Sequence, residues 1–230
     1  MLKLSLKAIE MPASPIRKLV PYSEKAKQEG KIVYHLNIGQ PDIATPETAL
    51  NAIHNFDQQV IEYSHSAGFE SYRTNLAAYY QKTGINVNAE DILITTGGSE
   101  ALIFGFMTTC NIGDEVIIPT PYWVTYSELV KIARGKVVEI RTTVANQFKT
   151  TAAELEAAIT PKTKVFMFSS PCNPSGAVYT LAELTALVEV FKKHPNIIIL
   201  SDEIYEYINF EGKHESIAQF AEIKDRVVVI

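Results

Sequence analysis

Residues 165–203 read VFMFSSPCNPSGAVYTLAELTALVEVFKKHPNIIILSDE, in which two apolar runs flank a helical pattern. The runs at 165–169 and 197–200 are apolar on both faces, which is typical of buried parallel strands. Between them, Thr180 with Glu183 fits a capping box at the start of a helix. A strand, a helix and a second strand in this order form a βαβ unit, so the stretch predicts a parallel sheet covered by helices.

The same alternation of strands and helices extends over most of the chain. Further apolar runs predict strands at residues 92–95, 115–118, 136–140 and 227–230. Thr151 with Glu154 fits a second capping box, and Gly84 and Gly135 are expected to end helices. The pattern predicts an α/β fold in which helices cover both faces of a mostly parallel sheet.

The chain start and the last strand suggest how the domains are divided. Residues 1–44 fit the alternation poorly, and we interpret them as an N-terminal arm and part of a small domain. Residues 45–230 are expected to form a large domain. Residues 227–230 look like a central strand, and each apolar side chain left uncovered there loses roughly 1.5–3 kcal/mol of burial. We therefore expect the large domain to be truncated at its C-terminal end, the alternative being a natural terminus on an inserted strand.

Composition narrows the function classes. The chain has 230 residues, 47% hydrophobic and 20% charged, with a net charge of -5. The dispersed charge argues against a nucleic-acid surface, and no apolar run approaches the ~20 residues of a membrane span. Cys110 and Cys172 lack metal-ligand spacing, so we interpret them as reduced thiols in a cytoplasmic protein, and no metal site is expected.

Three segments at predicted strand ends carry candidate ligand-binding residues, because ligands of open α/β sheets bind at the carboxyl ends of strands. In the glycine turn after residue 95, Gly98 and Ser99 begin a helix whose free N–H groups can hold a phosphate. The alternative is a glycine turn that only reverses the chain and binds no ligand. Asp202 either pairs with a ligand cation or caps the next helix. Asn173 either reaches a ligand oxygen or belongs to a rigid proline-rich turn.

Two further segments add candidates. Trp123, the only tryptophan, follows the strand predicted at 115–118. Its indole either stacks on a planar ligand ring or packs in the core. Gly39 lies in a glycine–proline loop, LNIGQPD, which by itself indicates only a turn.

Taken together, these motifs resemble the class I/II aminotransferases near aspartate aminotransferase, which are fold-type I pyridoxal-phosphate (PLP) enzymes. The resemblance runs over essentially the whole chain, through LNIGQPD, YSHSAGFESYR, TTGGSEAL, PYWVTY, SPCNPSGAVY and SDEIYEYI. It implies the PLP-transferase large domain, a three-layer structure, with part of a small domain. It also implies PLP as cofactor, an amino acid and a 2-oxo acid as substrates, and a homodimer.

The resemblance implies roles for individual residues. Gly98 and Ser99 would hold the PLP phosphate, which Tyr63 would reach from the neighbouring subunit. Trp123 would stack on the ring and Gly39 would lie beside the substrate carboxylate. The remaining roles concern polar atoms of the ring: Asn173 and Tyr205 would bind its hydroxyl oxygen, and Asp202 its nitrogen. The family's Asn173-Pro174 bond is often cis.

One departure from the family bears on activity. The lysine that forms the Schiff base follows, in this family, the strand predicted here at 227–230. No lysine present, including Lys213 and Lys224, sits in that context, so we expect this chain to be inactive alone. The alternatives are a non-catalytic fragment and another fold-type I enzyme of the β-lyase type. No helix-turn-helix precedes the domain to suggest a transcription regulator.

Overall fold

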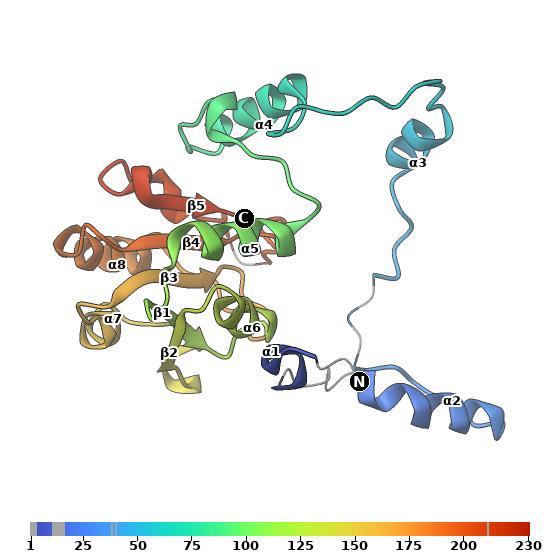
Figure 1. The fold of residues 1–230 in the computed structure, drawn as a ribbon, viewed down its shortest axis with the longest axis horizontal. Helices are drawn as coiled ribbons and strands as arrows, with labels where there is room; N and C mark the ends of the chain where they lie inside the picture. The colour runs from blue at the N-terminus through green and yellow to red at the C-terminus, as the bar shows by residue number, and fades with distance from the viewer. Residues whose placement is uncertain (1–3, 11–16, 38, 40, 211) are drawn as a thin grey trace. The chain divides into compact units, whose positions relative to one another are not determined.

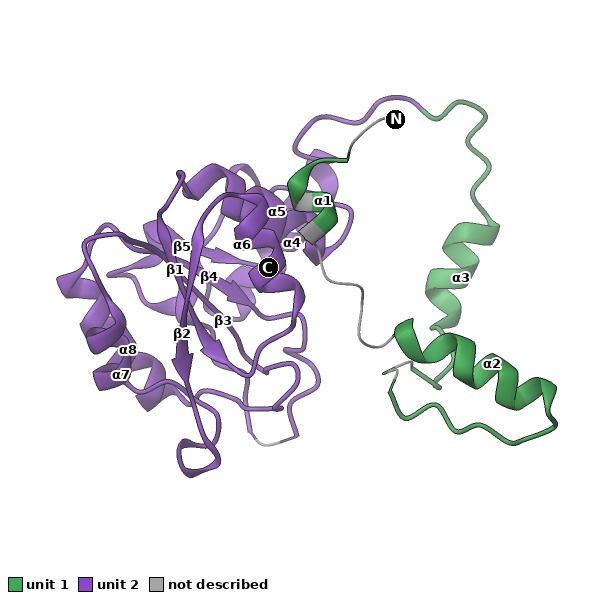
Figure 2. Cartoon of the chain, turned by 60° about the horizontal axis from the view of Figure 1, so that its bottom comes forward, with its two compact units in different colours: residues 1–61 green, residues 62–230 purple. Residues whose placement is uncertain are grey.

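The computed structural model describes residues 4–10, 17–37, 39, 41–210 and 212–230. It divides into two compact units, residues 1–61 and residues 62–230 (Figure 2). This division follows compactness alone, so the domain boundary expected after residue 44 stays a prediction.

The first unit has no hydrophobic core among its described residues, none of which is buried. Large apolar side chains such as Tyr34 and Leu36 are 80% and 95% exposed. Its helices are α1 (Leu6–Glu10), α2 (Val20–Gln28) and α3 (Glu47–His54), with a 3-10 turn at Arg17–Leu19.

The second unit is built on a five-stranded parallel sheet with the order β2-β1-β3-β4-β5 (Figure 1). Its strands are β1 (Glu115–Thr120), β2 (Lys136–Arg141), β3 (Thr163–Ser169), β4 (Ile198–Asp202) and β5 (Val227–Val229). Its helices are α4 (Glu70–Lys82), α5 (Gly98–Thr109), α6 (Thr125–Ile132), α7 (Ala152–Ala158) and α8 (Leu181–Lys193). Short 3-10 turns lie at Ala89–Asp91, Val144–Asn146, Ile217–Gln219 and Lys224–Arg226. The predicted α/β class and parallel sheet are confirmed.

Alternate strand residues enter two hydrophobic cores, one on each face of the sheet. Ile117 and Phe166 pack with residues of α7 and α8. Ile118 and Met167 pack with residues of α5 and α6 on the other face. The strands are apolar on both faces because both faces are covered, which gives the three layers predicted from the sequence.

Two expectations for strands were wrong. Residues 92–95 form no strand. The Ile94 N–H donates instead to the carbonyl of Ala67, which lies in a loop, at 3.0 Å. An extended segment without a neighbouring strand cannot build a ladder. The strand expected to be central, β5, lies at the edge of the sheet, where Val228 is 41% exposed.

Helix ends follow the sequence more closely. Both capping boxes form, at the starts of α7 and α8. Gly84 ends α4 with a φ of +94°, as expected. The expectation for Gly135 was wrong, because Arg134 takes the left-handed conformation after α6, with a φ of 64°. A Cβ built on Gly135 would lie 3.1 Å from the Val130 side chain and 3.3 Å from the Asp114 carbonyl, so the glycine allows close packing there.

The order of the strands places the candidate site. The chain passes from β1 outward to β2, then returns to β3 on the other side of β1 and continues to β4 and β5. The direction therefore reverses between β1 and β3. In open α/β sheets, ligands bind at such a switch point, outside the carboxyl ends of the strands.

Candidate functional site

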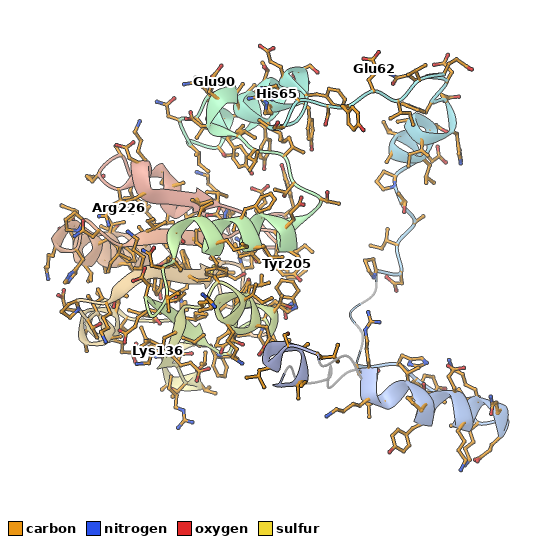
Figure 3. All side chains as sticks on the ribbon, viewed as in Figure 1. Glu62, His65, Glu90, Lys136, Tyr205 and Arg226 are labelled. Atoms are coloured by element: carbon orange, nitrogen blue, oxygen red, sulfur yellow. The ribbon has the colours of Figure 1, made fainter. Side chains whose placement is uncertain are left out.

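The candidate residues of the second unit follow the carboxyl ends of three strands. Trp123 follows β1, Asn173 follows β3, and Asp202 ends β4. Figure 3 shows Tyr205 and Arg226 at opposite ends of the strands: Tyr205 follows the carboxyl end of β4, and Arg226 precedes β5. Arg226 donates to carbonyls near the end of α8, including that of Phe191 at 2.7 Å. It therefore stabilises the fold at the amino ends of the strands, away from the candidate site.

Asp202 is a buried carboxylate, 5% exposed. Its Oδ2 accepts a hydrogen bond from the Tyr126 hydroxyl at 2.5 Å, and its Oδ1 accepts one from the Ile204 N–H at 3.3 Å. Burial raises the pKa of Asp202, and these two hydrogen bonds counteract that rise only in part. Among the described residues it has no ion pair, so its charge is stabilised by neutral donors alone. Such a carboxylate is suited to receive a cation.

Tyr126 joins Asp202 to Trp123. The indole of Trp123 meets the Tyr126 ring edge to face, with centroids 5.6 Å apart and planes at 90°. Burial, followed by the charge and hydrogen bond of Asp202, raises the pKa of the Tyr126 phenol, so the phenol stays protonated and donates. Trp123 is partly buried against the core formed with α5 and α6. Tyr126, within PYWVTY, was not among the residues predicted to have a role. Its spacing of three from Trp123 at a helix start was the available signal.

The glycine turn lies beside the end of β4. Gly97 precedes α5 with a φ of +86°, and α5 begins at Gly98. A Cβ built on Gly98 would lie 3.6 Å from Ile230, whose backbone pairs with Ser201 and Glu203 at 2.9 and 2.8 Å. The free N–H groups at the start of α5 therefore lie at the same edge of the sheet as Asp202.

The loop after β3 approaches the turn after β4. The Asn173 amide donates to the Tyr205 hydroxyl at 3.4 Å, a long hydrogen bond. The Asn173-Pro174 bond is cis, as the resemblance suggested, and so is the Ser170-Pro171 bond. The structure thus brings Asn173 and Tyr205 together.

The structure does not connect three other candidates to these contacts. Gly39 lies in the first unit, and a Cβ built on it would meet nothing within 4 Å. Tyr63 lies at the start of the second unit and is fully exposed. Ser99 is exposed, and no hydrogen bond of its side chain is found among the described residues. The roles of these residues stay predictions.

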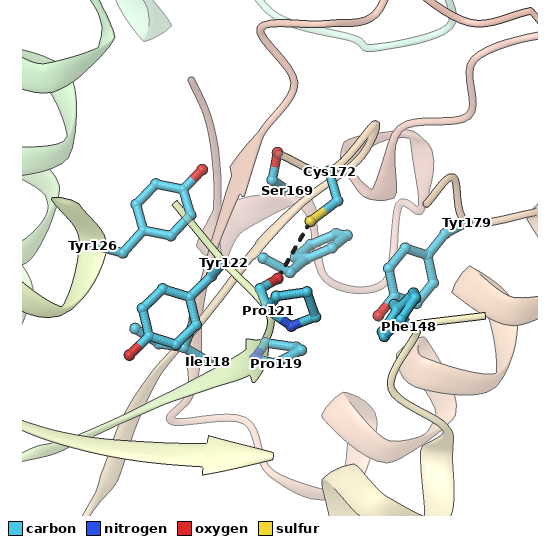
Figure 4. Close-up of a pocket in the computed structure, with 10 residues that line it drawn as sticks. Ile118, Pro119, Pro121, Tyr122, Tyr126, Phe148, Ser169, Cys172 and Tyr179 are labelled. Atoms are coloured by element: carbon cyan, nitrogen blue, oxygen red, sulfur yellow. Dashed lines mark hydrogen bonds between the residues drawn. The ribbon is translucent and has the colours of Figure 1, made fainter. Parts of the chain in front are cut away.

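A small pocket opens at the switch point between β1 and β3 (Figure 4). Tyr122 and Tyr126 line one side, and Ser169 and Cys172 line another. The Cys172 thiol donates to the carbonyl of Pro121 at 3.6 Å. The pocket has a volume of about 10 Å³, which is enough for about one water molecule and too small for a substrate.

Comparison with known proteins identifies the family. The sequence profile described as aminotransferase class I and II matches residues 31–230. The chain is 36% identical to the "Probable aspartate/prephenate aminotransferase" of Rickettsia bellii, with 94% of this chain and 55% of the relative covered. It is also 36% identical to the "Aspartate aminotransferase" of Bacillus subtilis, with 100% of this chain and 59% of the relative covered. The chain belongs to the class I and II aminotransferase family, whose aspartate aminotransferase-like members are PLP-dependent transferases.

Solved structures agree with this assignment. The fold is similar to that of an aspartate aminotransferase from Thermus thermophilus with maleate, at a TM-score of 0.91 and 33% identity. It is also similar to an aspartate aminotransferase from Rhizobium meliloti, at a TM-score of 0.90 and 35% identity. The chain is covered to 100% and 99%, and spans 60% and 58% of those chains. No helix among the described residues is long and apolar enough to cross a membrane.

Proposed function

We propose that this chain carries the PLP-binding part of an aminotransferase that moves an amino group between an amino acid and a 2-oxo acid. One observation carries the proposal: Tyr126 contacts both Trp123 and Asp202, on the edge of the sheet where α5 begins. An aromatic ring, a buried carboxylate and a helix N-terminus thus lie within one local site. These are the groups that a flat, cationic, phosphorylated ring requires.

The residues present fit the cofactor. When bound, PLP supplies an electron sink, which works best when its ring nitrogen is protonated. Asp202 would hold that proton at the nitrogen, because it is buried and has only neutral donors of its own. Tyr126 would keep the carboxylate in place. The buried pair of opposite charges would also relieve the burial penalty that raises the pKa of Asp202.

The other candidates would bind and orient the cofactor and substrate. Trp123 would support the ring by stacking, and the phosphate would meet the helix start at α5. The remaining contacts are those that the family implies: Gly98 and Ser99 with the phosphate, Asn173 and Tyr205 with the ring hydroxyl oxygen, Tyr63 with the phosphate of a partner subunit, and Gly39 with the substrate carboxylate. A homodimer and a cytoplasmic location belong to the same proposal.

We also propose that residues 1–230 by themselves do not transfer amino groups. Among the lysines whose side chains the structure describes, none donates a hydrogen bond to Asp202, Asn173 or Tyr205. The buried one, Lys149, is paired with Glu183 at 2.6 Å. Borohydride reduction of the chain with PLP is expected to trap no lysine at this site, and a trapped lysine would contradict this part of the proposal.

The proposal is tested in the whole protein that contains this chain. Asp202→Ala should keep much of the cofactor, seen by its absorbance, and lose most amino transfer, because the ring nitrogen loses its partner. Asp114→Ala is the matched control, since Asp114 accepts hydrogen bonds in the turn before β1, at the amino ends of the strands. Wild-type turnover in the Asp202 variant would sink the assignment. Release of ammonia without amino transfer by the unaltered protein would favour the β-lyase alternative.

A further inference from the structure

A second buried carboxylate directly follows Asp202. Glu203 is 6% exposed, and its side chain accepts three hydrogen bonds. The Ser201 and Ser216 hydroxyls both donate to Oε1 at 2.8 Å, and the His214 Nε2 lies 2.8 Å from Oε2. A buried charge is costly unless it is hydrogen-bonded. Here the partners come from both ends of the loop 203–216: Ser201 precedes it, and His214 and Ser216 lie near its close.

These bonds close the loop that contains Tyr205. Ser216 is 13 residues beyond Glu203, and His214 is 11 beyond it. Inside the loop, the backbone turn carrying Tyr205 begins at Glu203: the Glu206 N–H donates to the Glu203 carbonyl at 2.9 Å. The Ile208 N–H then donates to the Tyr205 carbonyl at 2.8 Å.

The other side of this turn is held from α4. The Tyr79 hydroxyl donates to Oε1 of Glu206 at 2.7 Å, and the Tyr79 ring lies 6.3 Å from that of Tyr207. Hydrogen bonds therefore hold the residues on both sides of Tyr205. Among the described residues, its own hydroxyl has one hydrogen bond, the long one from Asn173. Tyr207 and Ile208 are 80% and 56% exposed, so burial of apolar surface does little to hold the turn.

We propose that Glu203 is a positioning residue: its carboxylate ties Ser201, His214 and Ser216 together and thereby holds the Tyr205 hydroxyl where it meets the cofactor ring. This inference rests on the proposed function, which assigns Tyr205 to the ring hydroxyl oxygen. Glu203 itself would touch neither cofactor nor substrate.

The charges around His214 agree with this arrangement. Burial lowers the pKa of His214, but the hydrogen bond and charge of Glu203 outweigh it, with smaller contributions from Glu206 and Glu215. The pKa therefore ends above its ordinary value of 6.5, and the protonated imidazole strengthens the pair with Glu203.

The first experiment needs no cofactor and measures amide hydrogen exchange at Glu206 and Ile208. Glu203→Ala leaves buried donors without a partner, so exchange there should accelerate about tenfold or more. Ser216→Ala removes one donor only and should show a smaller acceleration of exchange. It also serves as the test variant if Glu203→Ala does not fold. Glu203→Gln, which keeps the shape and an acceptor, should restore part of the protection. Glu189→Ala is the charge-matched control, because Glu189 pairs with Lys192 on the exposed surface of α8, outside the loop. Unchanged exchange in the Glu203 and Ser216 variants would overturn the proposal.

The second experiment separates positioning from general loosening, using the cofactor-free whole protein. The probe is 4′-deoxypyridoxine 5′-phosphate, which cannot react with a lysine, and its own fluorescence reports binding. Glu203→Ala should weaken its binding about five- to tenfold, the range expected for one misplaced hydrogen bond. The loss should vanish in a Tyr205→Phe background, and also for the analogue without the ring hydroxyl.

The outcomes distinguish this inference from the proposed function. Equal losses in the Tyr205→Phe background would mean that Glu203 does not act through Tyr205, and would overturn the positioning role. A wild-type protein that binds neither probe would overturn the proposed function instead. Exchange at Glu206 and Ile208 would then still decide whether Glu203 holds the turn.

Discussion

Replacing Tyr126 by phenylalanine tests the contact on which the candidate site depends. The substitution removes only the hydroxyl that donates to Asp202 at 2.5 Å. It keeps the ring that packs against Trp123 and Tyr122, with centroids 5.6 and 6.3 Å away. Any loss of stability therefore reports the hydrogen bond rather than a cavity.

The magnitude follows from burial and charge. A hydrogen bond to a charged group contributes about 1.5–3 kcal/mol, and a bond between neutral groups about 0.5–1.5 kcal/mol. Asp202 is 5% exposed, so water replaces little of the lost bond. For a domain of this size, 1 kcal/mol shifts Tm by about 2–4 °C, so Tyr126→Phe should lower Tm by about 3–12 °C at neutral pH.

The cost of Tyr126→Phe should depend on pH. Burial raises the pKa of Asp202 above 3.8, and the Tyr126 bond acts to lower it. In Tyr126→Phe the carboxylate loses that help, so the variant is penalised most where Asp202 is ionised. As pH falls through the pKa of Asp202, the acid becomes neutral and the loss should shrink to that of a neutral bond.

The assay is urea unfolding of both proteins at neutral and acidic pH, repeated in an Asp202→Asn background. In that background, the cost of Tyr126→Phe should fall to about 0.5–1.5 kcal/mol at either pH. The same cost in both backgrounds would show that ring packing is responsible and would refute the reasoning. So would a loss below about 0.5 kcal/mol at neutral pH, the size of an ordinary surface change.

Two further predictions concern the loop and the glycine turn. Because the pKa of His214 lies above 6.5 in the folded chain, its pair with Glu203 should protect the Ile208 amide fully below that pH. The protection should decline as pH rises through the raised pKa, and a profile in His214→Gln as steep as in wild type would contradict this. Gly97→Ala should cost about 1–3 kcal/mol in urea unfolding, because a φ of +86° with a ψ of 167° is nearly restricted to glycine. Gly98→Ala should change stability by less than about 1 kcal/mol, since a Cβ there makes only an ordinary contact at 3.6 Å. A larger cost for Gly98→Ala than for Gly97→Ala would contradict this prediction.

Local features of the fold could be predicted from the sequence because they depend on residues close together in the chain. The capping boxes at Thr151 and Thr180 join residues three apart, and both formed. Apolar runs on both faces predicted buried parallel strands, and the three inner strands, β1, β3 and β4, are buried on both faces. The order of the motifs, from TTGGSEAL to SDEIYEYI, was enough to indicate the family that the comparisons then showed.

Contacts between distant residues required the tertiary structure. The bond between Tyr126 and Asp202 spans 76 residues, and nothing in either local sequence selects the other as its partner. The ties from Glu203 to His214 and Ser216 arise because the loop returns to the end of β4. Residues 92–95 read as a strand but found no neighbour, and β5 read as central but lies at the edge. Periodicity determines which face a side chain takes, whereas the order of the strands in the sheet determines what that side chain meets.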